Sequence, residues 1–374
     1  MTKTIGLKLE PLDVLFLRDG RPFGAATQGK STLPMPQTVA GAVWTALLDA
    51  AGCDFARFVE LVRGGTEIRE AMQETCGTPW IASVKIRGPW LARPTSKEDG
   101  IEVLVPVPAV LHGEKATTTQ EGNSRLHRLH PLRPDQLPGW QAPESAAGLW
   151  PLWLRCNRPT EPATGYLTRE GLRAFLHGEP VALDQRVKPE ELFDFDRRTG
   201  IAIHPDRLSS EEGLIYGASF LTLQTDVFFY VDVMIPDDGD HSLLETIKAL
   251  PLGGEGRRVR STMLREPYHW PEPVSHEGHQ KPLLVLTTPG CFVAGWRPAA
   301  LNGQLLAAAV PGSLSVSGWD LARGGPKPNR FAAQAGSVYY LNESLDPWPE
   351  TLSDNDRDAQ QGWGCYLKGV WTDE

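Results

Sequence analysis

The 374-residue sequence has no long apolar run and no unbroken apolar start. No run approaches the roughly 20 residues that a membrane-spanning helix needs. Glu10 and Asp13 interrupt the region where a secretory signal peptide would need its apolar segment. These absences predict a cytoplasmic protein that is not inserted in a membrane.

The sequence also lacks the usual signatures of metal and disulfide proteins. Its five cysteines are far apart, odd in number and never arranged as CxxC, which disfavours both a zinc site and a disulfide framework. Two histidine pairs, His127 with His130 and His276 with His279, lie in polar, loop-like sequence. We expect surface histidines there and no metal site, because a metal needs further ligands in an ordered frame.

The sequence has fewer basic than acidic residues. The chain has 37 Lys and Arg against 46 Asp and Glu, a formal net charge of −9. A generally basic coat of the kind that free-standing DNA-binding proteins carry is therefore excluded. A local basic groove and an acidic surface facing protein partners both remain compatible with this balance.

What is abundant is proline and glycine, 32 and 37 residues, which favours short strands and loops over long helices. The patterns predict a strand over 4–17, a helix from Pro36 with Val39, Val43 and Leu47 inward, strands over 81–92 and 101–111, a helix within 167–178 and a hairpin within 197–223. This order is that of a ferredoxin-like unit. A strand over 228–235, a helix over 241–252 and later strands suggest the same order again.

The most distinctive local feature is LGGEGRRVR, residues 252–260. Gly253, Gly254 and Gly256 allow positive φ and close backbone approach, and their amides can hold a phosphate. Three arginines follow as phosphate ligands: Arg257, Arg258 and Arg260. No GK[ST] follows, which disfavours a nucleoside triphosphatase. A flexible surface turn with solvated arginines is an equally open interpretation.

Two further stretches suggest an anion. FLRDGRPFG, residues 16–24, sets Arg18 and Arg21 around a turn and adds Phe23 as a stacking face, unless Phe23 folds back on the core. Lys30, Gln37 and Thr38 lie around the start of the predicted helix, where a helix N-terminus attracts anions. Three such features in one chain favour one shared polyanionic ligand.

Other segments carry weaker signals. The 112–130 stretch is expected to be a mobile hairpin or loop whose basic residues could touch a nucleic-acid backbone. His204 could act as an acid or base, although a lone histidine near a turn is usually structural. The acidic stretch 343–358 is predicted to be a solvated loop that could meet a basic partner. No GxSxG or HExxH motif occurs, so no catalytic residue is assigned.

Taken together, several stretches resemble one family. They are LEPLDVLFLRDGRPF, STLPMPQTVAGAVWTALL, RRTGIAIHPDRLSSEEGLIYGASFL, LGGEGRRVR, GWDLARGGPKPNRFAAQAGSVYYL and QGWGCYLKGVW. In this combination and order the sequence resembles Cmr subunit three, a RAMP-type subunit of type III-B CRISPR effector complexes. The least familiar part is 112–165.

The resemblance implies an α+β fold of two ferredoxin-like, RRM-like domains, over 1–215 with an insertion at about 112–165 and over 216–374. It implies a non-catalytic, cofactor-free subunit that clasps the 5′ tag of the CRISPR RNA and meets target RNA only indirectly. The implied protein partners are the large Cas10-type subunit and the RAMP subunits of the backbone.

The resemblance also implies where the RNA binds. The residues expected to line the site are Arg18, Arg21, Lys30, Gln37, Thr38, Arg197, Arg198, Gly253, Gly254, Gly256, Arg257, Arg258, Arg260, Lys327 and Arg330. A protruding hairpin in such proteins can wedge between tag and guide, and 112–130 is the candidate. Two alternatives stay open: a RAMP endoribonuclease that uses His204, and a scaffold subunit whose arginines meet protein carboxylates.

Overall fold

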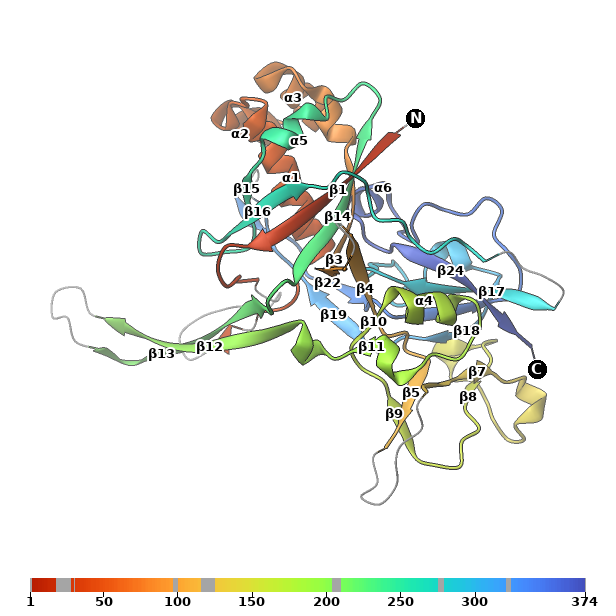
Figure 1. Cartoon of the computed structure of the whole chain (residues 1–374). Helices are drawn as coiled ribbons and strands as arrows, with labels where there is room; N and C mark the ends of the chain where they lie inside the picture. Colours follow the sequence, from red (N-terminus) through yellow and green to blue (C-terminus); the bar gives the residue numbers. More distant parts are fainter. Residues whose placement is uncertain are drawn as a thin grey trace.

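The structure is a computed structural model of the whole chain, shown in Figure 1, and it describes residues 2–17, 28–29, 31–96, 100–115, 125–203, 210–274, 279–320 and 324–373. The predictions for Arg18, Arg21, Lys30 and His204 lie outside these residues. The predicted α+β class is confirmed: the chain has few helices and mostly antiparallel sheets. No helix in the described ranges has the length and apolar character needed to cross a membrane.

An eight-stranded antiparallel sheet organises the first part of the molecule (Figure 1). Its strands, in spatial order, are β11 (Arg186–Val187), β10 (Tyr166–Leu167), β4 (Ile101–Pro106), β3 (Lys85–Pro94), β14 (Phe228–Pro236), β1 (Thr2–Pro11), β16 (Arg258–Met263) and β15 (Ala249–Pro251). The first strand of the chain thus pairs on one side with β14 and on the other with β16.

One face of this sheet is covered by α1 (Pro36–Ala50), the helix predicted from Pro36. Val39, Val43 and Leu47 are fully buried and share a core cluster with Leu7 and Leu9 of β1. Because these three recur at helical spacing, one helix face meets the sheet, and of the whole helix only Asp49 and Ala50 are exposed. Nearby lie three further helices: α2 (Phe55–Arg63), α3 (Ile68–Cys76) and α5 (Ser242–Thr246).

A second, four-stranded sheet lies in the C-terminal part. Its spatial order is β18 (Leu305–Ala309), β23 (Val338–Leu341), β17 (Gln280–Leu286) and β24 (Tyr366–Thr372). The predicted helix within 167–178 is confirmed as α4 (Arg169–Leu176), whose Leu172 and Phe175 share a core cluster with Leu283 and Trp371 of this sheet. The helix α6 (Asp356–Gln361) comes just before β24.

The two sheets repeat one strand order. Four neighbouring strands of the large sheet, β3-β14-β1-β16, have the same spatial order as the second sheet, β18-β23-β17-β24. In each set of four, the strand that comes first in the chain (β1 or β17) lies between the third and the fourth, and the second (β3 or β18) lies at one end of the set. The repetition predicted from element order therefore exists, but with different strands. The predicted boundary at 215/216 falls inside a hairpin strand, and strands from beyond it complete the large sheet, so that sheet does not divide there.

The hairpin predicted within 197–223 is confirmed as β12 (Phe193–Ile203) paired with β13 (Ser210–Leu223). It does not complete the large sheet, as the predicted element order required; it forms its own sheet, with β2 (Gln28–Gly29) parallel to β13, and projects from the body of the molecule (Figure 1). The predicted helix over 241–252 is also wrong in part, because five residues are helical and β15 follows.

The 112–165 insertion and the C-terminal loops form smaller elements. Short strands pair as β5 (Leu111–Glu114) with β6 (His127–Arg128) and β9 (Thr160–Pro162), β7 (His130–Pro131) with β8 (Leu152–Trp153), β19 (Ser313–Val316) with β22 (Arg330–Ala333), and β20 (Trp319–Asp320) with β21 (Gly325–Pro326). Six short 3-10 turns are η1 (Pro79–Ser83), η2 (Pro134–Gln136), η3 (Glu144–Ala146), η4 (Leu183–Gln185), η5 (Pro189–Glu191) and η6 (Ala299–Leu301).

The acidic stretch 343–358 is not simply a solvated loop. Glu350 accepts hydrogen bonds from Lys85 (2.7 Å) and Arg87 (3.0 Å) of β3, and the Lys85 hydrogen bond lowers its pKa. Asp354 accepts from the amides of Val293 and Ala299. The prediction is wrong in part: four of the six acidic residues are exposed, but the sequence does not show which distant cations and amides fold onto Glu350 and Asp354.

Candidate nucleic-acid interface

The glycine-rich loop connects β15 to β16 and is bent by its own backbone hydrogen bonds. The amide of Leu252 donates to the carbonyl of Arg257 (3.0 Å), and the amide of Arg257 donates to that of Gly254 (3.3 Å). Gly253, Glu255 and Gly256 all have positive φ, at 87°, 58° and 65°. Two of the three predicted glycines, Gly253 and Gly256, therefore adopt positive φ, whereas Gly254 does not and Glu255 does.

The loop lies against the chain that follows β1. The amide of Gly254 donates to the carbonyl of Phe16 (2.8 Å), and a Cβ at Gly253 would come within 2.6 Å of the same oxygen. The amide of Gly254 is thus engaged inside the protein. The amides of Gly253, Glu255 and Gly256 have no acceptor in the described part of the chain and remain available to an external anion.

Two arginines beside this loop, Arg198 and Arg257, lie close to the ring of Phe220 of β13. The guanidinium carbons of Arg198 and Arg257 lie 4.8 Å and 5.4 Å from the centre of its ring, and the ring of Phe16 lies 5.1 Å from it. Cation–π contact holds each guanidinium by its flat face and leaves N–H edges free to bond an anion. We call Phe16, Arg198, Phe220, Arg257 and the loop 252–257 the hairpin-base cluster.

Both arginines of the cluster have exposed carboxylate partners. Arg257 donates to Asp13, whose side chain is 62% exposed, and Arg198 pairs with Asp196 at 2.7 Å. The pKa of Asp13 is lowered, first by the hydrogen bond from the Val14 amide and then by Arg257. Exposed ion pairs of this kind contribute little to stability, so a phosphate can replace or share the carboxylate.

The neighbouring predicted residues are placed less favourably. Arg197 precedes Arg198 on β12, and alternate residues of a strand face opposite sides of the sheet. Arg258 donates to the carbonyl of Ala249 (3.2 Å), and Arg260 lies opposite Glu10 in the β1–β16 pairing. The structure thus places Arg257 and Arg198 together and turns the other three elsewhere.

A second group of predicted residues lines a cavity of about 250 Å³ at the start of α1. Gln37, Lys327 and Arg330 all contribute to its wall, together with Arg357 and Asp358. The side-chain amide of Gln37 donates to the carbonyl of Ser317 (2.7 Å). Thr38 follows in the first turn of α1, its amide bonded to the carbonyl of Met35 (2.9 Å).

The charges in this cavity are more deeply set. Arg330 pairs at 2.7 Å with Asp358, whose side chain is 4% exposed, and the hydrogen bond raises the pKa of Arg330. Burial lowers the pKa of Lys327, and no carboxylate in the described ranges forms an ion pair with its ammonium. Lys327 is therefore a cation of this cavity with capacity for an external anion, and Arg357 also lines the wall.

The segment 31–37 runs from one group to the other. The amide of Ser31 donates to Ser219 Oγ (2.9 Å), Ser31 Oγ accepts from the amide of Leu17 (3.2 Å), and six residues later Gln37 lines the cavity. Of the three sequence features, the glycine loop lies against Phe16 at the start of the 16–24 stretch, whose other residues from Arg18 on lie outside the described part of the chain. Gln37 of the helix start lines the cavity instead, and the prediction of one shared ligand stays a prediction. Sequence reasoning missed Phe220, whose only signal is an aromatic in SFLTL within the predicted hairpin.

Comparison with known proteins identifies the family. The chain is an α+β protein of antiparallel sheets with an arginine–aromatic cluster at the base of a projecting hairpin. Residues 7–371 match the family described as CRISPR-associated protein (Cas_Cmr3). Because the match covers nearly the whole chain, the protein belongs to the Cmr3 family.

Solved structures give more distant similarities. A chain of the cryo-EM structure of the type III-B Cmr-beta bound to cognate target RNA is 17% identical over 90% of this chain and 86% of that one, with a TM-score of 0.49. A chain of the Csm3–Csm4 subcomplex in the type III-A CRISPR-Cas interference complex is 12% identical over 97% and 98%, with a TM-score of 0.42. No curated protein matches the sequence.

Proposed function

We propose that this protein is a non-catalytic subunit of a type III-B Cmr effector complex and that it binds the 5′ tag of the CRISPR RNA. Its family membership supports the complex. The observation that carries RNA binding is the hairpin-base cluster, where the guanidinium groups of two arginines lie 4.8 Å and 5.4 Å from the centre of one aromatic ring. Beside them is a loop in which three amides have no acceptor among the described residues. Arginine forks and loop amides are suited to phosphate oxygens.

Binding would proceed by exchange of partners. A tag phosphate takes the place of Asp13 on Arg257 and of Asp196 on Arg198, while loop amides donate to a neighbouring phosphate. Both carboxylates are exposed and return to water at little cost. The RNA strand would then follow the 31–37 segment toward Lys327, which lines the cavity beside α1.

We further propose that the two strand quartets are two ferredoxin-like units. Each has the strand order of a β-α-β-β-α-β unit. In the first unit α1 connects β1 to β3 and α5 lies between β14 and β16; in the second, α6 precedes the last strand, β24. The units would run over about 2–263 and 280–372, with the large Cas10-type subunit and backbone subunits as protein partners. The projecting β12–β13 hairpin is a better wedge between tag and guide than 112–130.

The test is retention of tag-bearing RNA by the co-expressed complex. Arg198→Ala with Arg257→Ala should weaken retention by about tenfold per arginine, because a charge-assisted hydrogen bond contributes about 1.5 kcal/mol. The control is Arg57→Ala on α2, an exposed arginine held by Glu60 and Glu74 away from the hairpin in Figure 1. Equal retention by the double variant and the control would reject RNA binding at the cluster and favour a scaffold role.

The endoribonuclease alternative is tested separately. It depends on His204, which lies outside the described residues. Incubation of the purified chain with repeat RNA should leave the RNA intact. Cleavage that His204→Ala abolishes would show that the non-catalytic assignment is wrong.

A further inference from the structure

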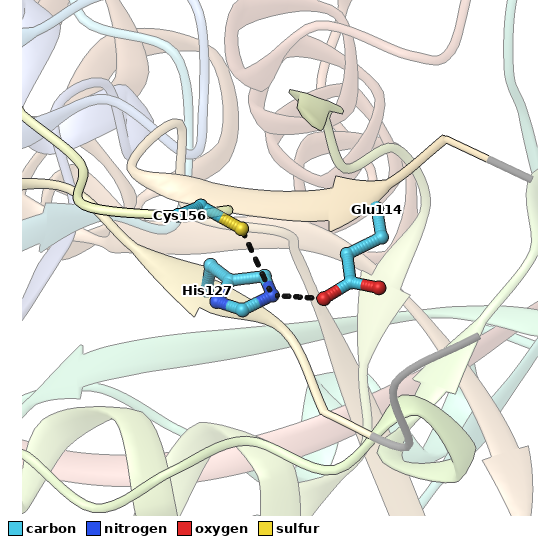
Figure 2. Close-up of side chains that lie close together, drawn as sticks. All are labelled: Glu114, His127 and Cys156. Atoms are coloured by element: carbon cyan, nitrogen blue, oxygen red, sulfur yellow. Dashed lines mark hydrogen bonds and ion pairs between the residues drawn. The ribbon is translucent and has the colours of Figure 1, made fainter. Parts of the chain in front are cut away.

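A second cluster of polar side chains lies far from the hairpin base, within the 112–165 insertion. Glu114 at the end of β5, His127 of β6 and Cys156 in the loop before β9 point toward one another (Figure 2). One ligand atom from each lies within 4.8 Å of the others. His127 Nε2 is 3.0 Å from Glu114 Oε1 and 3.8 Å from Cys156 Sγ.

These distances are close to those around a tetrahedral metal. Zinc binds sulfur at about 2.3 Å and nitrogen or oxygen at about 2.0–2.2 Å, so tetrahedral ligands lie about 3.6 Å (S to N) and about 3.4 Å (N to O) apart. The observed 3.8 Å and 3.0 Å differ from these values by a few tenths of an ångström. Small side-chain rotations would therefore be enough to admit the ion.

The surroundings orient the carboxylate. Arg158 Nη1 donates to Glu114 Oε2 at 3.0 Å, which leaves Oε1 directed at His127. A hydrogen bond to the oxygen that does not bind the metal is how proteins commonly fix a ligand. The side chains of Glu114 and His127 are only 10% and 15% exposed, while Arg158 is 40% exposed, so its charge is largely screened by solvent.

A simple Glu–His ion pair would not need the third member. Cys156 is a free, half-buried thiol, and at 3.8 Å from His127 it makes at most a weak hydrogen bond. Its sulfur completes a nitrogen, sulfur and oxygen donor set, which favours zinc over magnesium or calcium. The sequence pairs His127 with His130, whereas the structure brings His127 to Glu114 and Cys156, which are 13 and 29 positions away, and so motif spacing did not reveal the set.

His112 lies next to this group but outside the set of ligand atoms that are within 4.8 Å of one another, and its Nδ1 is 3.5 Å from Thr160 Oγ1. It lies directly opposite His127 in the β5–β6 pairing and two residues before Glu114, so all three share one face of the small sheet. Rotation of the His112 side chain away from Thr160 would supply a fourth ligand.

We propose that Glu114, His127 and Cys156 bind one zinc ion, with His112 as the fourth ligand. Binding breaks the His127–Glu114 hydrogen bond, and the Cys156 thiol releases its proton to solvent. The ion then joins β5, β6 and the loop before β9, and closes a chain segment of 29 residues between His127 and Cys156. The site is structural: it fixes the insertion against α4 and the second sheet, where Arg128 donates to the carbonyls of Phe175 of α4 and Val370 of β24.

The test measures the zinc content of the purified protein, freed of any affinity tag, after exposure to zinc and removal of unbound ion. We expect about one zinc per chain, and with cobalt as the probe a thiolate-to-cobalt absorption band. Cys156→Ser and His127→Gln should lose the bound metal. Cys53→Ser should keep it, because Cys53 is another half-buried free thiol that hydrogen-bonds Thr75 instead.

The outcomes separate cleanly. Substoichiometric zinc in the wild-type chain, or a cobalt spectrum without a thiolate band, would overturn the proposal without any variant. Equal zinc retention in Cys156→Ser and Cys53→Ser would overturn it as well. Circular dichroism on Cys156→Ser shows whether the loss of metal follows from misfolding, and in that case the wild-type cobalt spectrum decides.

Discussion

The two groups of predicted RNA-binding residues differ in how their arginines are paired. Arg257 meets Asp13, a carboxylate that is 62% exposed, whereas Arg330 meets Asp358, which is 4% exposed. Removing one partner of a buried pair leaves an uncompensated charge, while an exposed carboxylate is readily rehydrated. Arg257 can therefore be shared with a phosphate, and Arg330 is committed to the fold.

Arg330 should accordingly show the largest effect on stability. Arg330→Ala leaves Asp358 buried without its cation, beside the Asn355 cap of α6, and should lower the free energy of unfolding by about 3 kcal/mol. Urea denaturation measures this. Arg57→Ala, whose partners are exposed, should change it by less than about 1 kcal/mol. Equal effects of the two variants would remove the distinction between buried and exposed pairs.

The glycine loop offers a matched pair of substitutions. Gly253→Ala places a Cβ 2.6 Å from the carbonyl of Phe16 at a φ of 87°, whereas Gly256→Ala has a φ of 65° and open space. The first should cost about 2–3 kcal/mol and the second about 1 kcal/mol. Thermal denaturation compares them. A Gly256→Ala cost as large as that of Gly253→Ala would contradict the close approach to Phe16.

Arg257 should affect RNA binding more than stability. Arg257→Ala should reduce the slope of log affinity against log salt by about 0.7, the value of one single-stranded phosphate contact. Arg257→Lys should keep the slope and still bind more weakly, because lysine has no planar fork. Fluorescence titration with tag RNA at several salt concentrations measures both. An unchanged slope in Arg257→Ala would exclude a phosphate contact.

Substitution of Lys327 should have the smallest effect, and it should appear in the pH dependence of the free energy of unfolding. Its folded pKa is lowered by burial, so between that value and 10.5 the unfolded chain binds more protons. Stability should therefore rise with pH through this window, fall as the pH drops through it, and be independent of this group below it. Lys327→Met should flatten the rise in urea denaturation at alkaline pH. A steeper rise in the variant would show that the ammonium is stabilised by the fold.

Local chemistry could be predicted from the sequence. The glycines of 252–257 signalled a loop with positive φ, Pro36 and its apolar spacing signalled α1, and the turn in 197–223 signalled the β12–β13 hairpin. Each of these depends on neighbours a few residues away. The helix α2 was not predicted, although Asp54, which caps it by accepting from the amides of Ala56 and Arg57, is a usual start signal.

Long-range pairing could not be predicted. Nothing near β1 in the sequence shows that its partners are β14 and β16, more than 200 residues later. Because these late strands join β1 in the large sheet, that sheet extends past the predicted boundary at 215/216. In the same way Phe220 meets Phe16 and Arg257 because β13 pairs beside the chain that follows β1, as the Leu15–Leu221 hydrogen bonds record. Periodicity does not encode such contacts.

Crosslinking tests the central claim most directly. A CRISPR RNA carrying a photoreactive 5′ tag would be bound in the co-expressed complex, irradiated, and its adducts mapped by mass spectrometry. The hairpin-base cluster predicts adducts on 196–200, 219–220 and 252–258 that disappear when the tag sequence is moved to the 3′ end. RNA held by the complex with no adduct on these segments would contradict the claim and leave the cluster to a protein partner.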